Sequence, residues 1–257
     1  MRPTRLMLAL ALALALAALP AFAGAETLPD PRQLIDRHLE ASGGADAIRN
    51  SGDGSAKMSI VVAENGMRGD MQLYSRGRDM VVNMTMAGME IRSGMVGDIA
   101  WSIDPMLGPR LLEGKELEDQ RRNVDPDVLT FADESIESMK TVALADSEGR
   151  PCYRVEILWK SGDETASCFG TDEGLALYSE STSVSPMGEM RQTIHLYDYK
   201  TLGKVRVASR MRSSAMGMTQ VMTIEDYQEG TPPDEVFALP PAIQSLLDAG
   251  AGAQSAE

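Results

Sequence analysis

The sequence predicts a mainly β fold built on a single antiparallel sheet, and two patterns indicate it. From Gly54 onward, apolar and polar residues alternate with a period of two, most regularly over residues 80–86. Tight-turn residues such as Asn65-Gly66 and Ala87-Gly88 separate the alternating segments. We therefore expect about eleven meandering strands with one apolar and one solvated face.

Helices are predicted at two places. Asp30 followed by Pro31 is typical of a helix start, an apolar stripe follows it, and Gly43-Gly44 ends that helix before a short one over 45–49. Residues 105–126 interrupt the alternation and contain a charged segment that predicts a helix over 113–123. Such an insertion often acts as a lid or binding loop, although a solvated connection with no role is the alternative.

Residues 1–25 have the pattern of a bacterial secretory signal peptide. Arg2 and Arg5 precede an uninterrupted Leu/Ala run that is too short to span a bilayer. Cleavage is expected after Ala23 or Ala25, and no Cys follows as a lipid-anchor site. We expect a soluble, exported, periplasmic protein with one domain over 26–248 and a flexible tail over 249–257.

The charge balance restricts the partners. The chain carries 24 basic and 38 acidic residues, for a net charge of −14, and loss of Arg2 and Arg5 with the signal makes the mature chain more negative. Such a field repels phosphate backbones and anionic membrane surfaces, so it argues against nucleic acid as a partner. We expect a monomer.

Two cysteines, Cys152 and Cys168, fall on the polar face of adjacent predicted strands. In an oxidising compartment they are candidates for a disulfide. With a hairpin turn at Ser161-Gly162-Asp163, the bond would need a bulge or a longer loop. Two unpaired, partly buried thiols are the alternative.

No arrangement of residues indicates catalysis. His38 lies on the apolar stripe of the first predicted helix, and His195 lies on the polar face of a strand. Nucleophile-elbow, zinc-protease, phosphate-loop and dinucleotide motifs are all missing from the sequence. Two histidines and two cysteines do not form a convincing transition-metal site. We expect no enzyme activity, cofactor or metal.

Several short segments, taken in order, resemble a known family. They are Ala41-Ser42-Gly43-Gly44-Ala45, Gly97-Asp98-Ile99-Ala100-Trp101, Gly108-Pro109, Gly149-Arg150-Pro151-Cys152-Tyr153-Arg154-Val155, Ser185-Pro186-Met187-Gly188, Asp198-Tyr199-Lys200 and Asp234-Glu235-Val236-Phe237. Together they resemble the outer-membrane lipoprotein-sorting proteins, relatives of the periplasmic carrier LolA, over residues 31–240. The resemblance implies an incomplete, curved β half-barrel whose mouth is covered by the N-terminal helices and the mid-chain insertion. It also implies an apolar cavity for acyl chains.

Methionine is abundant, with 18 residues, whereas aromatic residues make up only 5% of the chain. Met is flexible and suits a surface that accommodates variable apolar shapes, but an ordinary Met-rich core is the alternative. From the alternation we predict that the cavity is lined by Met71, Leu73, Met80, Val82, Met84, Met86, Met89, Ile91, Met95, Trp101, Val155, Ile157, Trp159, Ile194, Leu196, Met218 and Met222.

The function that these observations favour is a periplasmic carrier of lipid or acylated lipoprotein cargo, and the family resemblance implies a role in outer-membrane lipoprotein sorting. A lipid-sensing regulatory module that docks on an inner- or outer-membrane protein is the first alternative. An enzyme acting on a lipid-like substrate is the second.

Overall fold

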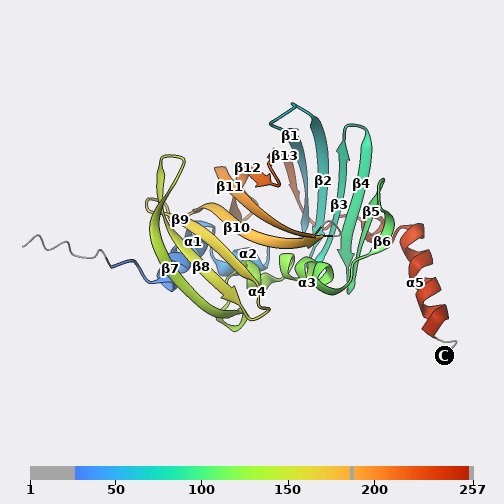
Figure 1. Cartoon of the computed structure of the whole chain (residues 1–257), viewed down its shortest axis with the longest axis horizontal. Helices are drawn as coiled ribbons and strands as arrows, with labels where there is room; N and C mark the ends of the chain where they lie inside the picture. Colours follow the sequence, from blue (N-terminus) through green and yellow to red (C-terminus); the bar gives the residue numbers. More distant parts are fainter. Residues whose placement is uncertain (1–26, 186–187, 255–257) are drawn as a thin grey trace, which may run out of the picture.

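The computed structural model describes residues 27–185 and 188–254 and is mainly β, as predicted. Thirteen antiparallel strands form one sheet in the order β6-β5-β4-β3-β2-β1-β13-β12-β11-β10-β9-β8-β7 (Figure 1). The strands are β1 (Gly54–Val62), β2 (Arg68–Arg76), β3 (Asp79–Met86), β4 (Met89–Val96), β5 (Ile99–Asp104), β6 (Gly108–Leu111), β7 (Ile136–Ser147), β8 (Arg150–Trp159), β9 (Glu164–Gly170), β10 (Ala176–Ser185), β11 (Gly188–Leu202), β12 (Val205–Ala215) and β13 (Met218–Glu229).

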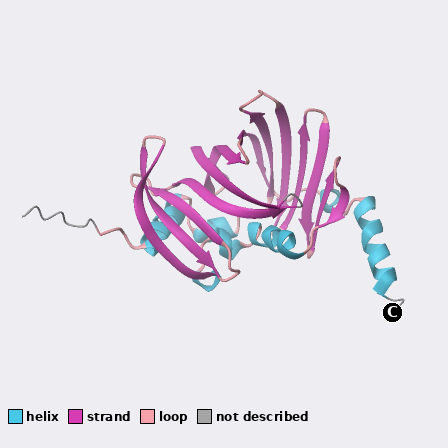
Figure 2. Ribbon diagram, in the orientation of Figure 1, coloured by secondary structure: helices cyan, strands magenta, loops and turns pink. Residues whose placement is uncertain are grey.

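Helices occupy the connections and the two ends of the described chain (Figure 2). They are α1 (Pro31–Ala41), α2 (Ala45–Arg49), α3 (Gly114–Asn123), α4 (Pro126–Leu129) and α5 (Pro241–Gln254), with short 3-10 turns η1 (Asp133–Ser135) and η2 (Asp234–Phe237). The predicted signal peptide lies outside the described residues.

The sheet curves but does not close. Pairing of β1 with β13 joins the two halves of the chain, and β6 and β7 stand at opposite ends of the strand order. The predicted number of about eleven strands was too low. The strand β6 was missed because it is only four residues long and contains Pro109 within the expected insertion.

The first helix begins where the sequence predicts. The side chain of Asp30 accepts hydrogen bonds from the backbone N–H groups of Arg32 and Gln33, and Pro31 occupies the first turn. Its stripe of Leu34, Ile35 and Leu39 packs on β8 and β9 in a buried cluster that includes Val155 and Phe169. One face of the sheet is therefore covered at β8 and β9. These strands belong to the part of the sheet from β7 to β11, which we call the β7–β11 arm.

The predicted helix in the insertion is also present, as α3. Leu117 and Val124 pack against Met95, Ala100 and Leu112, which lie on or next to β4, β5 and β6 in the other arm of the sheet, formed by β1–β6. The same helix contacts β10, so it lies between the two arms (Figure 1).

The C-terminal helix α5 was not predicted. Its Ile243 is fully buried with Val81, Trp101 and Phe237, which lie on the sheet face opposite to α3. The helix continues through the predicted tail boundary at residue 249 to Gln254, and the rest of the predicted tail lies outside the described residues.

A disulfide joins Cys152 and Cys168, whose Cα atoms are 5.4 Å apart. No bulge is needed in this hairpin, contrary to expectation, because Leu158 pairs with Glu164 and the register places Cys152 opposite Gly170. The bond thus crosses diagonally between β8 and β9. Both sulfurs are fully buried beside Leu177 and Tyr178.

Candidate functional site

The strand register shows which side chains share the face that carries α1 and α3. Met71 lies opposite Met84, and Met84 lies opposite Ile91, so these three share one face of β2, β3 and β4. Leu196 and Met222 both lie opposite Met211, which continues the same face across β11, β12 and β13. We call it the helix-side face.

Five of the seventeen predicted lining residues belong to filled core. Val155, Ile157 and Trp159 lie beneath α1, and Met95 lies beneath α3. Trp101 pairs with Gly94 and therefore points to the opposite face, where it packs against Phe237 and Ile243. These five positions are buried, and none of them lines the apolar cavity beside α1 and α2.

The other twelve lie on the helix-side face and are partly or fully exposed. They are Met71, Leu73, Met80, Val82, Met84, Met86, Met89, Ile91, Ile194, Leu196, Met218 and Met222. In Figure 1 the upper parts of β1–β4 rise above the level of α3, which packs against Met80, Met95 and Ala100. We call the exposed group Met71, Met84, Met86, Met89, Ile91, Met218 and Met222 the methionine wall.

An open-sided cavity of about 480 Å³ continues this face beside α1 and α2. It is lined by His38, Ser42, Ile48, Ser51, Ala56, Met58, Leu73, Leu196, Tyr199, Leu202, Val205, Arg206, Val207, Ala208, Met211, Ile224 and Tyr227. Its volume lies within the range of small-molecule sites. Leu73 and Leu196 are the predicted residues that line it.

The sequence reasoning missed most of this cavity. Met58 and Ile224 do lie on apolar sides of alternating strands, so their pattern was a usable signal. The helix residues Ile48 and Ser51 gave none, because the packing of a five-residue helix on a distant strand is a tertiary feature.

The polar groups of the cavity are kept neutral. Burial lowers the pKa of His38 to about 4, although a hydrogen bond with the backbone of Gly174 acts in the other direction. Burial also raises the pKa of Tyr199, whose hydroxyl donates to the carbonyl oxygen of Ala176 at 2.8 Å. Among the lining residues the charge is confined to Arg206, which pairs with Glu173.

This burial predicts an acid sensitivity. Because the pKa of His38 falls from 6.5 in an exposed setting to about 4 in the folded chain, the unfolded chain binds the proton more readily between these values. Stability is therefore lost as pH falls through this window, by about 2–3 kcal/mol from this residue at pH 4.5.

Urea unfolding of the wild type and His38→Gln at pH 7 and pH 4.5 measures the effect. We expect the free energy of unfolding to fall more in the wild type than in the variant. Equal falls in the two proteins would show that the imidazole is not held neutral by burial.

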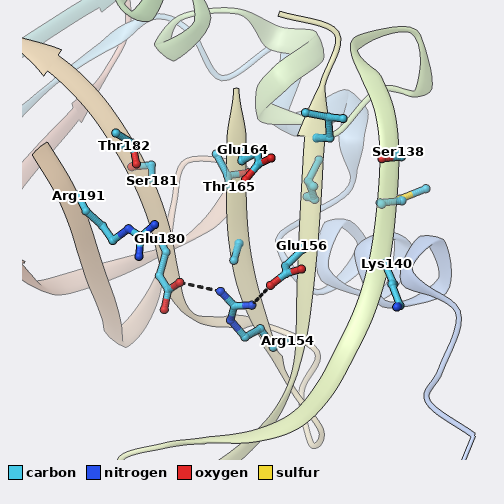
Figure 3. A pocket seen from close by; sticks show the side chains of 14 residues that line it. Ser138, Lys140, Arg154, Glu156, Glu164, Thr165, Glu180, Ser181, Thr182 and Arg191 are labelled. Carbon is cyan, nitrogen blue, oxygen red and sulfur yellow. Dashed lines mark hydrogen bonds and ion pairs between the residues drawn. The ribbon is translucent and has the colours of Figure 1, made fainter. Parts of the chain in front are cut away.

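A second and larger hollow, of about 720 Å³, lies on the opposite face of the β7–β11 arm. Its residues Arg154 and Glu156 alternate along β8 with Val155 and Ile157, which pack toward α1. Figure 3 shows the guanidinium of Arg154 between Glu156 and Glu180, with 2.8 Å separating it from Glu180. These internal ion pairs make the hollow polar, so it does not suit an apolar ligand.

Ion pairs fasten α3 across the gap between the arms. Lys115 and Arg122 on α3 both contact Asp163 in the β8–β9 turn, and both also lie within 3.3 Å of Asp119. Burial alone would raise the pKa of Asp163, but hydrogen bonds from Lys115 and Ser161 and the charges of Arg122 and Lys115 lower it overall. We call these four residues the α3 latch: Lys115, Asp119, Arg122 and Asp163.

Replacing Asp163 by Asn is expected to lower the free energy of unfolding by about 1–2 kcal/mol, because two partly buried cations lose a partner. Faster hydrogen exchange confined to α3 would locate the change. Asp36→Asn removes an acid from the exposed pair with Arg32 and serves as the control, with an expected loss below about 0.5 kcal/mol. Equal effects of the two substitutions would contradict a latch.

Within the described part of the chain, no group of three or more His, Cys, Asp or Glu side chains is placed to hold a metal ion. No helix of residues 27–185 and 188–254 has the length and apolar character needed to cross a membrane.

The fold and site together define an open, curved antiparallel sheet whose helix-covered face contains an apolar cavity. Solved structures with this architecture include a LolA superfamily protein from Nitrosomonas europaea, at 15% identity and a TM-score of 0.52, covering 82% of this chain and 99% of that one. A DUF1329 family protein from Desulfovibrio piger matches at 14% identity and a TM-score of 0.50, covering 82% and 98%. An outer membrane lipoprotein-sorting protein domain from Vibrio parahaemolyticus has 14% identity and a TM-score of 0.49, covering 79% and 97%.

The chain therefore has a LolA-like fold, as the sequence resemblance implied. No family model matches the sequence, and no curated protein does either. At these identities the similarity establishes the fold alone.

Proposed function

We propose that this protein is a periplasmic carrier that shelters the acyl chains of a lipid or lipoprotein and works without a covalent step. The observation that carries the proposal is the open-sided apolar cavity beside α1 and α2. Its residues Met58 and Met211 lie opposite Met71 and Met222 of the partly exposed methionine wall. Both lie on one face of a sheet that does not close.

The energetics of carriage fit such a surface. Removing an acyl chain of about 16 carbons from water is worth roughly 12 kcal/mol at about 0.8 kcal/mol per CH₂. Moving the same chain out of a bilayer gains almost nothing, because it is already in hydrocarbon. A carrier therefore needs a cavity that is about as apolar as lipid, and unbranched, polarizable methionine side chains provide an adaptable one.

The residues of the cavity divide this work. Met58, Met211 and Ile224 provide apolar contact, while the neutral state of His38 avoids placing a buried charge beside the chain. Loading would require α1, α2 or α3 to move relative to the sheet. The α3 latch is the polar contact that a movement of α3 would break.

Native mass spectrometry of protein purified without detergent, followed by lipid extraction, tests the proposal. We expect bound species whose mass excess matches one or two acyl-chain amphiphiles. The same preparation of Ala56→Phe, in which a phenyl ring would fill the cavity, should be free of them. A wild-type preparation that never carries or takes up an amphiphile would contradict carriage and favour a module that only docks on a protein.

A further inference from the structure

Six of the exposed large apolar side chains gather at one edge of the sheet. They are Met67, Met89, Met106, Leu107, Met216 and Met218. Met106 is 87% exposed and Met216 is 67% exposed. All six lie in or beside four hairpin turns: β5–β6, β3–β4, β1–β2 and β12–β13.

These four turns are neighbours in space. The strand order runs β6-β5-β4-β3-β2-β1-β13-β12, so the turns follow one another along the same edge. The β1–β2 and β3–β4 turns stand at the top of Figure 1. Successive turns are separated by two strand spacings, about 10 Å. We call this row the apolar rim.

The composition of the apolar rim is unlike that of the opposite edge. The β3–β4, β5–β6 and β12–β13 connections contain no charged residue. The β1–β2 connection contains one, Glu64, whose carboxylate accepts a hydrogen bond from the backbone N–H of Thr219 at 2.9 Å. At the opposite edge, all five turns between described strands carry a charge: Arg78, Asp98, Glu148, Asp172 with Glu173, and Lys204.

The exposed side chains are also held outward by the backbone. Asp104 accepts hydrogen bonds from the N–H groups of Met106 and Leu107, at 2.7 and 3.1 Å, which fixes that turn. Met216 has a φ of +50°, a conformation that usually favours Gly, Asn or Asp. A methionine at this position exposes an apolar side chain at some conformational cost.

We propose that the apolar rim inserts into the surface of a zwitterionic phospholipid bilayer, which has no net charge. This proposal deepens the proposed carrier function and rests on it. Single unbranched side chains about 10 Å apart fit a fluid interface, because lipid closes around each one. A protein partner would have to fill the spaces between them with a matching surface. The net charge of −14 opposes anionic lipid and leaves zwitterionic lipid as the favoured surface.

Continuity with the site supports this partner. Met89 and Met218 belong to both the apolar rim and the methionine wall, and Met86 and Met222 continue the wall from them along the same strands and hairpins. An acyl chain leaving a bilayer at the rim would meet apolar side chains along the helix-side face before it reached the cavity. The rim therefore provides the entry side of the site.

Flotation with phosphatidylcholine vesicles tests the proposal on the full mature chain. We expect weak binding that is insensitive to salt and is reduced when phosphatidylglycerol is added. Combined Met67→Gln, Met106→Gln, Leu107→Gln and Met216→Gln, none of which belongs to the methionine wall, should lower the bound fraction about fivefold or more. The matched control replaces four exposed leucines elsewhere: Leu28→Gln, Leu129→Gln, Leu144→Gln and Leu246→Gln.

A second reporter separates insertion from indirect effects. In Met106→Trp, brominated phosphatidylcholine should quench the new tryptophan, whereas the buried Trp101 and Trp159 of the wild type should stay unquenched. Wild type that does not float, equal losses in the rim and control variants, or an unquenched Trp at position 106 would overturn the proposal.

Binding of a fluorescent fatty acid in vesicle-free solution distinguishes this proposal from the carrier function. The rim variant should keep that affinity. Flotation without any fatty-acid binding would overturn the carrier function, and fatty-acid binding without flotation would overturn the rim proposal alone.

Discussion

Replacing Ala56 by Phe is expected to weaken fatty-acid binding about tenfold or more, equivalent to about 1.4 kcal/mol, while the fold remains intact. Ala56 lies on β1 between Leu73 on β2 and Tyr227 on β13, and all three line the open-sided cavity. A phenyl ring at this position would occupy the space that the acyl chain needs. Titration with a fluorescent fatty acid measures the loss.

The stability of the same variant tests whether the space is vacant. Forcing a ring into a filled core typically costs about 1–3 kcal/mol, whereas a hollow accepts it at little cost. Ala242→Phe on the exposed side of α5 is the control and should leave binding unchanged. Unaltered binding in Ala56→Phe, or a strong loss of stability with it, would indicate a filled core.

Replacing both cysteines by alanine is expected to lower the free energy of unfolding by about 3 kcal/mol, because the bond closes a short loop in the unfolded chain. Cys152 and Cys168 are 16 residues apart and fully buried, so the disulfide tethers β8 to β9 at the end of the hairpin remote from the turn that carries Asp163 of the α3 latch. Guanidinium unfolding of the oxidised wild type and the double variant measures the difference.

Reduced wild type provides the matched control, since it keeps the side chains and lacks only the bond. It should lose a similar amount of stability, and non-reducing peptide mapping should recover the Cys152–Cys168 pair from the oxidised protein. A double variant as stable as the oxidised wild type would show that the bond does not contribute.

Local pattern in the sequence was sufficient to predict much of the fold. Asp30 with Pro31 marks the start of α1, and the charged segment after Glu113 marks α3, because capping and amphipathic spacing are local properties. The alternation identified most strands. It failed at β6, which is too short to show a period. The helix α5 was also missed, although Pro241 in its first position is typical of a helix start.

The candidate site was harder to predict because alternation shows on which face of the sheet a side chain lies, but not which helix packs on that face. Val155 and Met84 both lie on apolar sides of strands, yet α1 buries the first and the second stays partly exposed. Trp101 was assigned to the wrong face for a related reason: the opposite face also holds a buried apolar cluster, beneath η2 and α5. Which strands a distant helix covers is decided by tertiary packing, and a single sequence does not encode it in a readable period.

Photo-crosslinking with a diazirine-bearing fatty acid, followed by mapping of the labelled peptides, tests the central claim most directly. We expect adducts on residues of the open-sided cavity and the methionine wall, such as Met58, Met211 and Met222, with label suppressed by unlabelled fatty acid and by Ala56→Phe. Label confined to the polar hollow around Arg154, or spread over the surface without competition, would contradict it.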